Sequence, residues 1–189
     1  DCDPENRYCI PNTWEIYGLG VDREAMEHQA IHPSLRAVFD ESLIDYKLSM
    51  TPDPGEAIVF ASYYLFGPVK KLNQEQAGQV RDLLAKQKGW VEAYADYRAK
   101  YLIQTKNCPL ALVRSSLIWQ IGKEHDFMEF IAPEDGTFMT VENLAIPKES
   151  EKDDLVYQLI NFLYRPDVQG RQIGYSPVYP VVKAALEHT

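Results

Sequence analysis

Polar and charged side chains follow three apolar segments of the chain, at points where the sequence predicts a turn. They are Asp53 with Glu56, then Arg114 with Ser115 and Ser116, and then Glu142 with Thr140. A carboxylate attracts an ammonium group, and a guanidinium attracts a carboxylate or a phosphate. If the three turns converge, they form a cleft suited to a small charged ligand.

These residues also have structural interpretations that need no ligand. Asp53 precedes the apolar segment Ala57–Phe66 and is a suitable N-cap for a helix there. Glu56 is then an acid in the first turn, where it favours the helix dipole. Arg114 follows an apolar segment and needs a counter-ion, so an internal salt bridge with Glu142 or Asp53 is the alternative to a ligand contact. The sequence leaves both interpretations open.

The sequence lacks the motifs of common enzyme classes. It contains no Gly-x-Ser-x-Gly, no phosphate-binding glycine loop and no His-Glu-x-x-His. Asp53 and Glu142 are the carboxylates that would serve a small hydrolase or transferase, which is the least favoured of three functions. We therefore expect no enzyme, no catalytic residue and no cofactor.

Composition and charge predict a folded, acidic domain. The chain has 189 residues, of which 46% are hydrophobic, and a formal net charge of −9. Binding to nucleic acid depends on clustered Lys and Arg, so we expect no nucleic-acid partner. No segment reaches the roughly 18 apolar residues that are needed to cross a bilayer.

The spacing of histidine and cysteine predicts no metal site. His28 and His32 are four residues apart, but a proline follows His32, so we interpret both as exposed loop residues. Cys2 and Cys9 flank a short polar loop and either form a disulfide or remain thiols. Cys108 adjoins an apolar segment, which predicts a buried, inert thiol.

The apolar pattern predicts strands that alternate with helices. Strands are expected at Cys9–Val21, Tyr46–Thr51, Pro109–Val113, Phe127–Ala132 and Thr137–Val141, with a further strand-like run at Val141–Pro147. Helices are expected at His32–Glu41, Ala57–Phe66, Asn73–Lys88, Trp90–Leu102, Leu117–Lys123 and Leu155–Tyr164. The tyrosines of the segment Trp90–Leu102 are expected in the core. Such alternation indicates an α/β fold, in which ligands bind at strand-to-helix turns.

The order of several short motifs resembles a known family, the extracytoplasmic solute-binding proteins of ABC importers, of the spermidine/putrescine-binding type. The motifs are Tyr8–Trp14, Gly18–Val21, Glu142–Pro147, Leu159–Val168 and Ile173–Pro177, the last three reading LAIP, INFL, RPDV and GYSP in part. The resemblance implies an α/β lobe of the periplasmic-binding-protein type II, with a mixed sheet flanked by helices. It also implies that residues 1–141 form the second lobe and that residues 142–189 return toward a first lobe.

The resemblance also implies a set of ligand-binding residues. They are Asp53, Glu56, Arg114, Thr140, Glu142 and Tyr175. Asp53 and Glu56 match the acidic pair that holds ammonium groups in the family. Glu142 stands at the position of an aspartate, and Tyr175 matches the tyrosine of the Gly-Tyr-x-x-Pro segment. Arg114 and Thr140 replace two tryptophans, which removes cation–π attraction worth about 0.5–2 kcal/mol per contact.

The function that the resemblance implies is transport. The ligand is then a polyamine or a related small cationic or zwitterionic solute, the partner is the membrane permease of an ABC importer, and the location is periplasmic or extracytoplasmic. A ligand with both an amine and a carboxylate would suit Arg114 beside Asp53 and Glu142. The alternative is a regulatory or interaction module of the same fold, in which bridges from Arg114 to carboxylates close the cleft.

Overall fold

The structure is a computed structural model that describes all residues except 1–2, 4, 27–32, 177 and 189. It consists of two compact units, which we describe separately. Unit 1 comprises Asp1–Glu15 and Met139–Thr189, and unit 2 comprises Ile16–Phe138. The long strand β1 (Ile10–Asp22) contributes residues to both units. The assignment of residues 1–141 to a second lobe and of residues 142–189 to a segment that returns toward a first lobe remains a prediction.

Unit 2 is built on a mixed sheet with the order β3-β2-β4-β1-β5. The short central strand β2 (Leu48–Met50) lies parallel to β3 (Val91–Tyr94) and to β4 (Leu110–Arg114). The second half of β1 lies antiparallel to β4 and to β5 (Met128–Ile131). The predicted mixed sheet is therefore confirmed.

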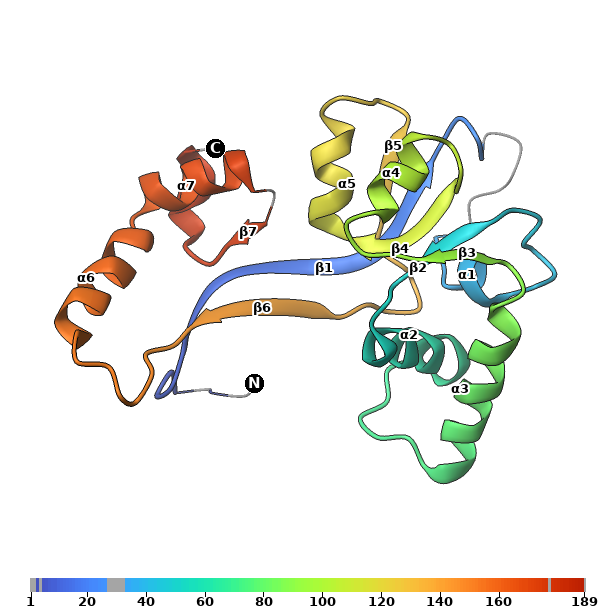
Figure 1. The fold of residues 1–189 in the computed structure, drawn as a ribbon, viewed down its shortest axis with the longest axis horizontal. Coiled ribbons are helices and arrows are strands. Elements are labelled where there is room, and N and C mark those ends of the chain that lie inside the picture. The colour runs from blue at the N-terminus through green and yellow to red at the C-terminus, as the bar shows by residue number, and fades with distance from the viewer. Residues whose placement is uncertain (1–2, 4, 27–32, 177, 189) are drawn as a thin grey trace. The chain divides into compact units, whose positions relative to one another are not determined.

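Helices cover both faces of this sheet (Figure 1). One face packs against α1 (Arg36–Phe39), α2 (Pro54–Phe66) and α3 (Gln74–Gln87). The other face packs against α4 (Ala99–Gln104) and α5 (Ser115–Gly122). The predicted α/β fold is thus a layered sheet with a separate apolar core on each side.

The pairing of β1 with β4 shows why both faces are apolar. Leu19 lies opposite Leu112, and both side chains belong to the core beneath α2. The neighbouring residues point to the opposite face, where Gly18 lies opposite Val113 in the core beneath α5. Successive side chains of a strand alternate between faces, so a strand that is buried on both sides is apolar at nearly every position.

Gly18 has a clear packing reason. A Cβ atom at this position would lie 2.5 Å from the carbonyl oxygen of Ile131 and 2.6 Å from the ring of Phe130. Both residues are on the neighbouring strand β5. The glycine therefore allows β5 and its aromatic side chain to approach β1 closely.

Helices α2 and α3 each begin at an N-cap residue that is suited to this position. Asp53 caps α2, because its Oδ1 accepts the backbone N–H of Glu56 at 3.0 Å. Asn73 caps α3 in a capping box, in which its side chain and that of Gln76 each accept the other residue's backbone N–H. Both follow the usual chemistry of helix N-termini.

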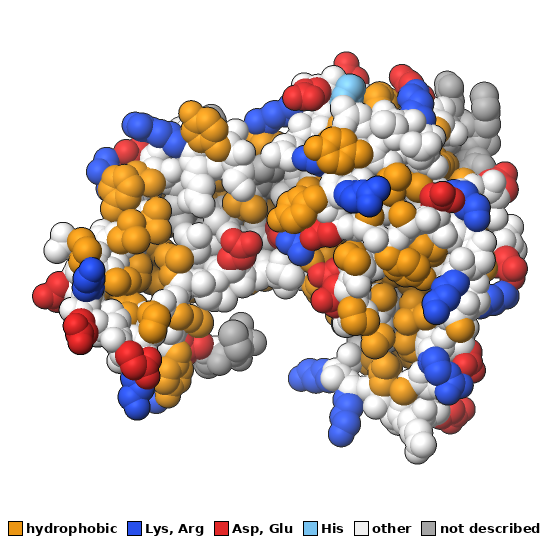
Figure 2. Space-filling model, viewed as in Figure 1, with side chains coloured by type: hydrophobic (Ala, Val, Ile, Leu, Met, Phe, Trp, Pro, Cys, Tyr) orange, Lys and Arg blue, Asp and Glu red, His pale blue; other side chains and the backbone are white. Residues whose placement is uncertain are grey.

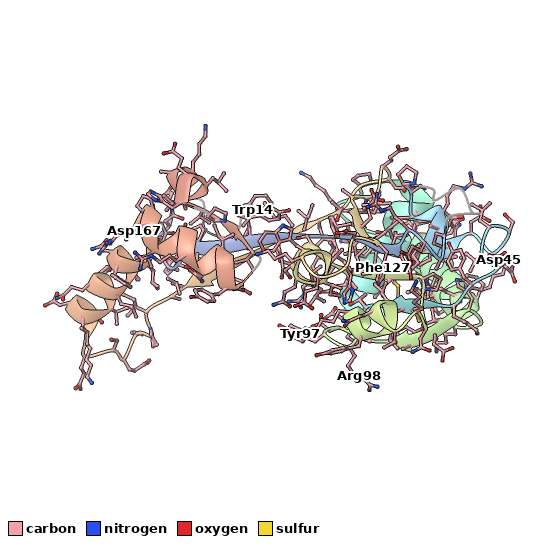
Figure 3. All side chains as sticks on the ribbon, turned by 90° about the horizontal axis from the view of Figure 1, so that it is seen from above. Trp14, Asp45, Tyr97, Arg98, Phe127 and Asp167 are labelled. Carbon is pink, nitrogen blue, oxygen red and sulfur yellow. The ribbon has the colours of Figure 1, made fainter. Side chains whose placement is uncertain are left out.

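The prediction of one helix over Trp90–Leu102 is wrong. The segment forms β3, followed by a turn and then α4, because the backbone of β3 pairs with β2. Its tyrosines are also exposed rather than buried, with 49% exposure for Tyr94 and 65% for Tyr97. Figure 3 shows the side chain of Tyr97 and that of Arg98 projecting from the ribbon of unit 2. Their helical spacing is a coincidence, since the strand and the following helix each contribute part of it.

Unit 1 is held together by the first half of β1. This half pairs with β6 (Met139–Leu144) and with the two-residue strand β7 (Tyr179–Pro180). Trp14 stacks on Tyr179 with ring centroids 4.3 Å apart, and its indole N–H donates to the carbonyl of Pro180 at 3.1 Å. The strand predicted at Thr137–Val141 and the run that follows it are one strand, β6.

The remaining elements of unit 1 are helical. They are α6 (Asp153–Leu163), α7 (Pro166–Tyr175) and a 3-10 helix, η1 (Lys183–His188). The helix predicted at Leu155–Tyr164 is confirmed as α6. A second helix, α7, was not predicted from the sequence; Pro166 starts it, and it continues to Tyr175.

Helix α6 carries an unusually exposed apolar surface. Of its residues, Ile160 is buried, whereas Leu155, Tyr157, Leu159 and Phe162 are 49–61% exposed. Figure 2 shows hydrophobic side chains gathered over the part of unit 1 that contains α6. We name this set the α6 surface.

Other sequence-based predictions can be checked in part. Cys108 is fully buried as expected, and burial raises the pKa of its thiol. Cys2, His28 and His32 lie outside the described residues, so the two interpretations of the Cys2–Cys9 loop stay open. No helix in the described part of the chain is both long and apolar enough to cross a membrane.

The packing at Gly18 predicts that Gly18→Ala destabilises unit 2. We expect a loss of about 1–3 kcal/mol in the free energy of unfolding, because the added methyl group meets a backbone carbonyl that cannot rotate away. Urea denaturation followed by circular dichroism measures this change.

Gly78→Ala is the matched control, since Gly78 lies within α3 and a Cβ there meets nothing within 4 Å. This variant should gain up to about 1 kcal/mol through helix propensity. Equal effects of the two variants would contradict the close-approach explanation for Gly18.

Candidate ligand-binding site

The candidate site in unit 2 lies at the carboxyl ends of its three parallel strands. Thr51 follows β2, Asp96 follows β3 by two residues, and Arg114 ends β4. Because β3, β2 and β4 are adjacent and parallel, these ends lie along the same edge of the sheet. Ligands of α/β proteins commonly bind at this edge.

The carboxylate of Glu56 is the centre of this group. It accepts the hydroxyl of Tyr17 on one oxygen and the hydroxyl of Thr51 on the other. Both donors are buried, with 2% exposure for Tyr17 and 4% for Thr51. The two hydroxyls come from β1 and from the end of β2, so the sheet itself fixes the direction in which the carboxylate points.

The hydroxyl of Tyr17 stays protonated over the physiological range. Burial raises its pKa well above the ordinary value, and the hydrogen bond to the Glu56 carboxylate raises the pKa further. A neutral phenol donates to a carboxylate, whereas a phenolate would repel it. The ring of Tyr17 is held by stacking on Phe138, with centroids 4.6 Å apart. Tyr17 is therefore a fixed donor.

Arg114 lies next to this group through the register of the sheet. Tyr17 and Arg114 are direct partners across β1 and β4, so their side chains leave the same face. The guanidinium carbon of Arg114 lies 5.6 Å from the centre of the Tyr17 ring, which is a cation–π distance. The structure thus brings Arg114 and Glu56 to the same tyrosine.

The counter-ion of Arg114 in unit 2 is a residue that neither sequence-based alternative named. Its Nη2 lies 3.5 Å from Oδ2 of Asp96, and the two side chains are 31% and 33% exposed. The salt bridge proposed with Asp53 or Glu142 is thereby corrected to one with Asp96. The physical reason is that Asp96 follows β3 and Arg114 ends β4, and these two strands flank β2 on either side.

Asp53 is confirmed as the N-cap of α2, and it stands beside Glu56 at the exposed rim of the group. Its own backbone N–H donates to the hydroxyl of Thr51 at 3.2 Å. The side chain of Asp53 accepts the Glu56 N–H through one oxygen, Oδ1. Asp53 is exposed and keeps its second oxygen for other partners. Its structural role does not prevent a role in binding.

The other three predicted site residues belong to unit 1. Thr140 and Glu142 are two residues apart on β6 and therefore point to the same side of that strand. Glu142 is exposed, and its Oε2 accepts the hydroxyl of the buried Thr13 at 3.1 Å. Tyr175 is the last residue of α7, and 88% of it is exposed. Their assignment to a binding site remains a prediction.

Sequence reasoning missed Tyr17, Thr51 and Asp96. Thr51 ends the predicted strand Tyr46–Thr51 but has no predicted role, and Asp96 lies inside a predicted helix that does not form. Tyr17 is a large aromatic residue directly before the segment Gly18-Leu19-Gly20. This contrast in size is a signal that could have identified Tyr17 as a packing residue of the strand. Its contact with Glu56 depends on sheet pairing and could not be seen in the sequence.

The chemistry that this group offers is charge pairing and hydrogen bonding. Glu56 and Asp53 offer carboxylate oxygens, and Arg114 offers guanidinium N–H groups, so the group suits a small ligand with charged ends. Within the described part of the chain, no three His, Cys, Asp or Glu residues are grouped so that they could hold a metal ion.

Comparison with known proteins gives one consistent result. The sequence matches the family of bacterial extracellular solute-binding proteins over residues 4–189. The chain is 26% identical over 188 residues to a putrescine/agmatine-binding protein of Pseudomonas aeruginosa, covering 92% of this chain and 51% of that protein. It is 24% identical over 185 residues to the spermidine/putrescine-binding periplasmic protein of Escherichia coli K12, covering 97% and 52%.

A solved structure supports the same fold. The TpPotD lipoprotein of Treponema pallidum superposes with a TM-score of 0.81 at 20% identity, covering 97% of this chain and 59% of that one. The chain thus spans about half the length of the relatives it matches. The fold implied by the sequence resemblance is confirmed, and both sequence relatives are named as binding proteins. Since the match extends over nearly the whole chain, the chain belongs to the family of bacterial extracellular solute-binding proteins.

Proposed function

We propose that the chain is a ligand-binding lobe of a solute-binding protein that serves an ABC importer outside the cytoplasm. Its solute is a small cation or zwitterion, with polyamines as the reference class. The observation that supports this most directly is the Glu56 carboxylate, which two buried hydroxyls hold at the sheet edge where this fold binds ligands. The names of the relatives point to the same class of ligand.

The acidic end of the site is prepared for an ammonium group before any ligand arrives. Tyr17 and Thr51 each use one lone pair of the Glu56 carboxylate, and each oxygen keeps another. Preorganisation of this kind lowers the entropic cost of binding, because the carboxylate does not have to be ordered by the ligand. Asp53 adds a second carboxylate at the same turn.

A solute-binding protein of this family needs a second lobe, and the α6 surface supports such an arrangement. A helix with four apolar side chains about half exposed is unusual for a monomer, and such surfaces mark interfaces. We propose that residues 142–189 return toward a first lobe, as the sequence resemblance implies, and that this lobe covers the α6 surface. Closure of two lobes around the solute would then present it to a membrane permease.

The alternative of a regulatory or interaction module has no specific observation in its favour. It required bridges from Arg114 to the carboxylates that would close the cleft. The counter-ion shown in unit 2 is Asp96, and Asp53 and Glu56 are held by other partners. Binding of a transported solute is therefore the function that the geometry supports best.

Asp53→Asn tests the proposed site without removing the helix cap. Asn is as good an N-cap as Asp, so the free energy of unfolding should change by less than about 1 kcal/mol. The loss of a charged acceptor should weaken binding of a cationic solute such as putrescine about tenfold or more. Titration calorimetry or NMR titration measures the affinity.

The control for this charge change is Asp82→Asn. Asp82 lies on the outer helix α3, and its side chain is 70% exposed. The Asp82→Asn variant removes the same charge far from the candidate site, so it should leave the affinity for putrescine unchanged. If Asp53→Asn binds putrescine as well as the parent chain does, Asp53 has no role in the site.

The α6 surface gives a second test. In the chain studied alone, we expect the exposed side chains to cause self-association and binding of the dye ANS. Leu155→Lys combined with Leu159→Lys should reduce both, because the two leucines lie one turn apart on α6. Each side chain is more than half exposed, so each substitution should change stability by about 0.5 kcal/mol or less.

The matched control is Gln158→Lys combined with Asn161→Lys, which adds the same charge at exposed polar positions of the same helix. Sedimentation velocity over a range of concentrations gives the association state. An equal reduction by the control would show that charge, rather than the apolar surface, governs association.

A further inference from the structure

We propose that a basic and aromatic surface formed by α4 and α5 binds the anionic phospholipid surface of a membrane. We name it the α4–α5 surface. It consists of residues of the two helices and of the positions that adjoin them: Tyr97, Arg98, Lys100, Tyr101, Trp119 and Lys123. This inference goes beyond the proposed function, because it concerns where the protein is held rather than which solute it binds.

The sequence of this region differs in charge from the rest of the chain. Residues 97–123 contain five Lys or Arg residues and no Asp or Glu. The whole chain has 19 basic and 28 acidic residues, so all 28 acidic residues lie elsewhere, among the other 14 basic ones. A basic region in a chain that is otherwise strongly acidic indicates an anionic partner for that region.

Three of the five basic residues have charges that a partner can use. Lys106 and Arg114 already have carboxylate counter-ions within unit 2. Arg98, Lys100 and Lys123 form no ion pair with any residue that the structure describes. Arg98 and Lys123 are exposed, and Lys100 is half-buried. These three cations belong to the α4–α5 surface.

Exposed aromatic rings accompany the cations. Tyr97 is 65% exposed, Tyr101 is 55% exposed and Trp119 is 46% exposed. The Nζ of Lys100 lies 5.1 Å from the centre of the Tyr101 ring, and the Nζ of Lys123 lies 3.8 Å from the centre of the Trp119 ring. Tyr and Trp combine an apolar ring with a polar tip, so they are suited to the boundary between lipid headgroups and acyl chains.

The two helices present these groups together. Ile103 of α4 and Ile118 of α5 belong to one apolar core, on one face of the sheet. On the solvent side, Lys100 of α4 donates a hydrogen bond to Oε1 of Gln120 on α5 at 3.5 Å. Figure 2 shows hydrophobic and basic side chains next to one another over the part of unit 2 that contains α4 and α5. The α4–α5 surface is therefore continuous across both helices.

A lipid surface fits this arrangement better than an acidic protein does. A stable protein interface has an apolar core that is surrounded by a polar rim. In the α4–α5 surface, Lys100 and Lys123 each lie over an aromatic ring, so charged and apolar groups alternate. A bilayer needs no matching shape, and an anionic leaflet attracts each Lys or Arg near it separately.

The negative net charge of the chain does not prevent this contact. At physiological ionic strength the Debye length is about 8 Å, so charges that lie farther than this from the lipid are largely screened. The cations of the α4–α5 surface lie at the contact itself, where the attraction is strongest. Their effect therefore exceeds that of the distant acidic residues.

Co-sedimentation of the whole chain with vesicles tests the inference. Vesicles of phosphatidylcholine are compared with vesicles of equal parts of phosphatidylcholine and phosphatidylglycerol. We expect binding to the anionic vesicles to be about tenfold tighter or more, because three cations contribute to it. This preference should disappear at about 1 M salt, where the Debye length is about 3 Å.

Two double variants test the two kinds of residue. Lys100→Gln combined with Lys123→Gln should weaken binding to the anionic vesicles about tenfold or more. Tyr101→Ser combined with Trp119→Ser should also weaken it, although the net charge is unchanged, because the rings no longer enter the headgroup region. Circular dichroism checks that each variant is folded.

The matched control is Lys70→Gln combined with Lys71→Gln. Both residues are exposed and lie in the segment between α2 and α3, outside the α4–α5 surface. This variant removes the same charge, so it should change vesicle binding by less than about twofold. An equal loss in this control and in the variant of Lys100 and Lys123 would overturn the inference.

The remaining outcomes separate the inference from the proposed function. Equal binding to both kinds of vesicle, or binding to neither, would overturn the inference, and the latter would favour an acidic protein as the partner. A chain that binds putrescine but no vesicle upholds the proposed function alone. A chain that prefers anionic vesicles but binds no putrescine upholds the inference and counts against the proposed function.

Discussion

The carboxylate of Glu56, held by the hydroxyls of Tyr17 and Thr51, is the interaction on which the candidate site depends. A carboxylate beside an apolar core is costly unless its oxygens have donors, and here each oxygen has one. Both donors are neutral, so the negative charge is fixed in direction without being neutralised. This is the condition under which a carboxylate remains attractive to a cationic ligand.

The same interaction links the site to the fold. Tyr17 reaches Glu56 because β1 pairs with β4 in a register that places Tyr17 on the α2 side of the sheet. The register is held on the opposite side by Gly18, whose lack of a side chain allows β5 to lie close. A shift by one residue would send Tyr17 to the other face and leave Glu56 without its donor. Packing at Gly18 and the position of the Glu56 carboxylate are therefore two consequences of one strand register.

The sequence predicted those parts of the structure that depend on local signals. The Asp53 cap, the helix that starts near Asn73 and the apolar strand before Arg114 depend on neighbouring residues, and all three form as expected. The helix over Trp90–Leu102 failed because hydrogen bonds from β3 to β2 outweighed a periodicity that suited a helix. The helix α7 was missed, although Pro166 is a usual first residue of a helix.

The site was harder to predict than the fold because its contacts join residues far apart in the chain. Asp53, Glu56 and Arg114 could be selected by chemical type, but their geometry comes from Tyr17, 39 residues from Glu56. The counter-ion of Arg114 could not be selected at all, since Asp96 lay in a segment with the wrong predicted structure. What distinguishes this site is the cross-strand pair of Tyr17 and Arg114, which gives one aromatic ring two charged neighbours of opposite sign.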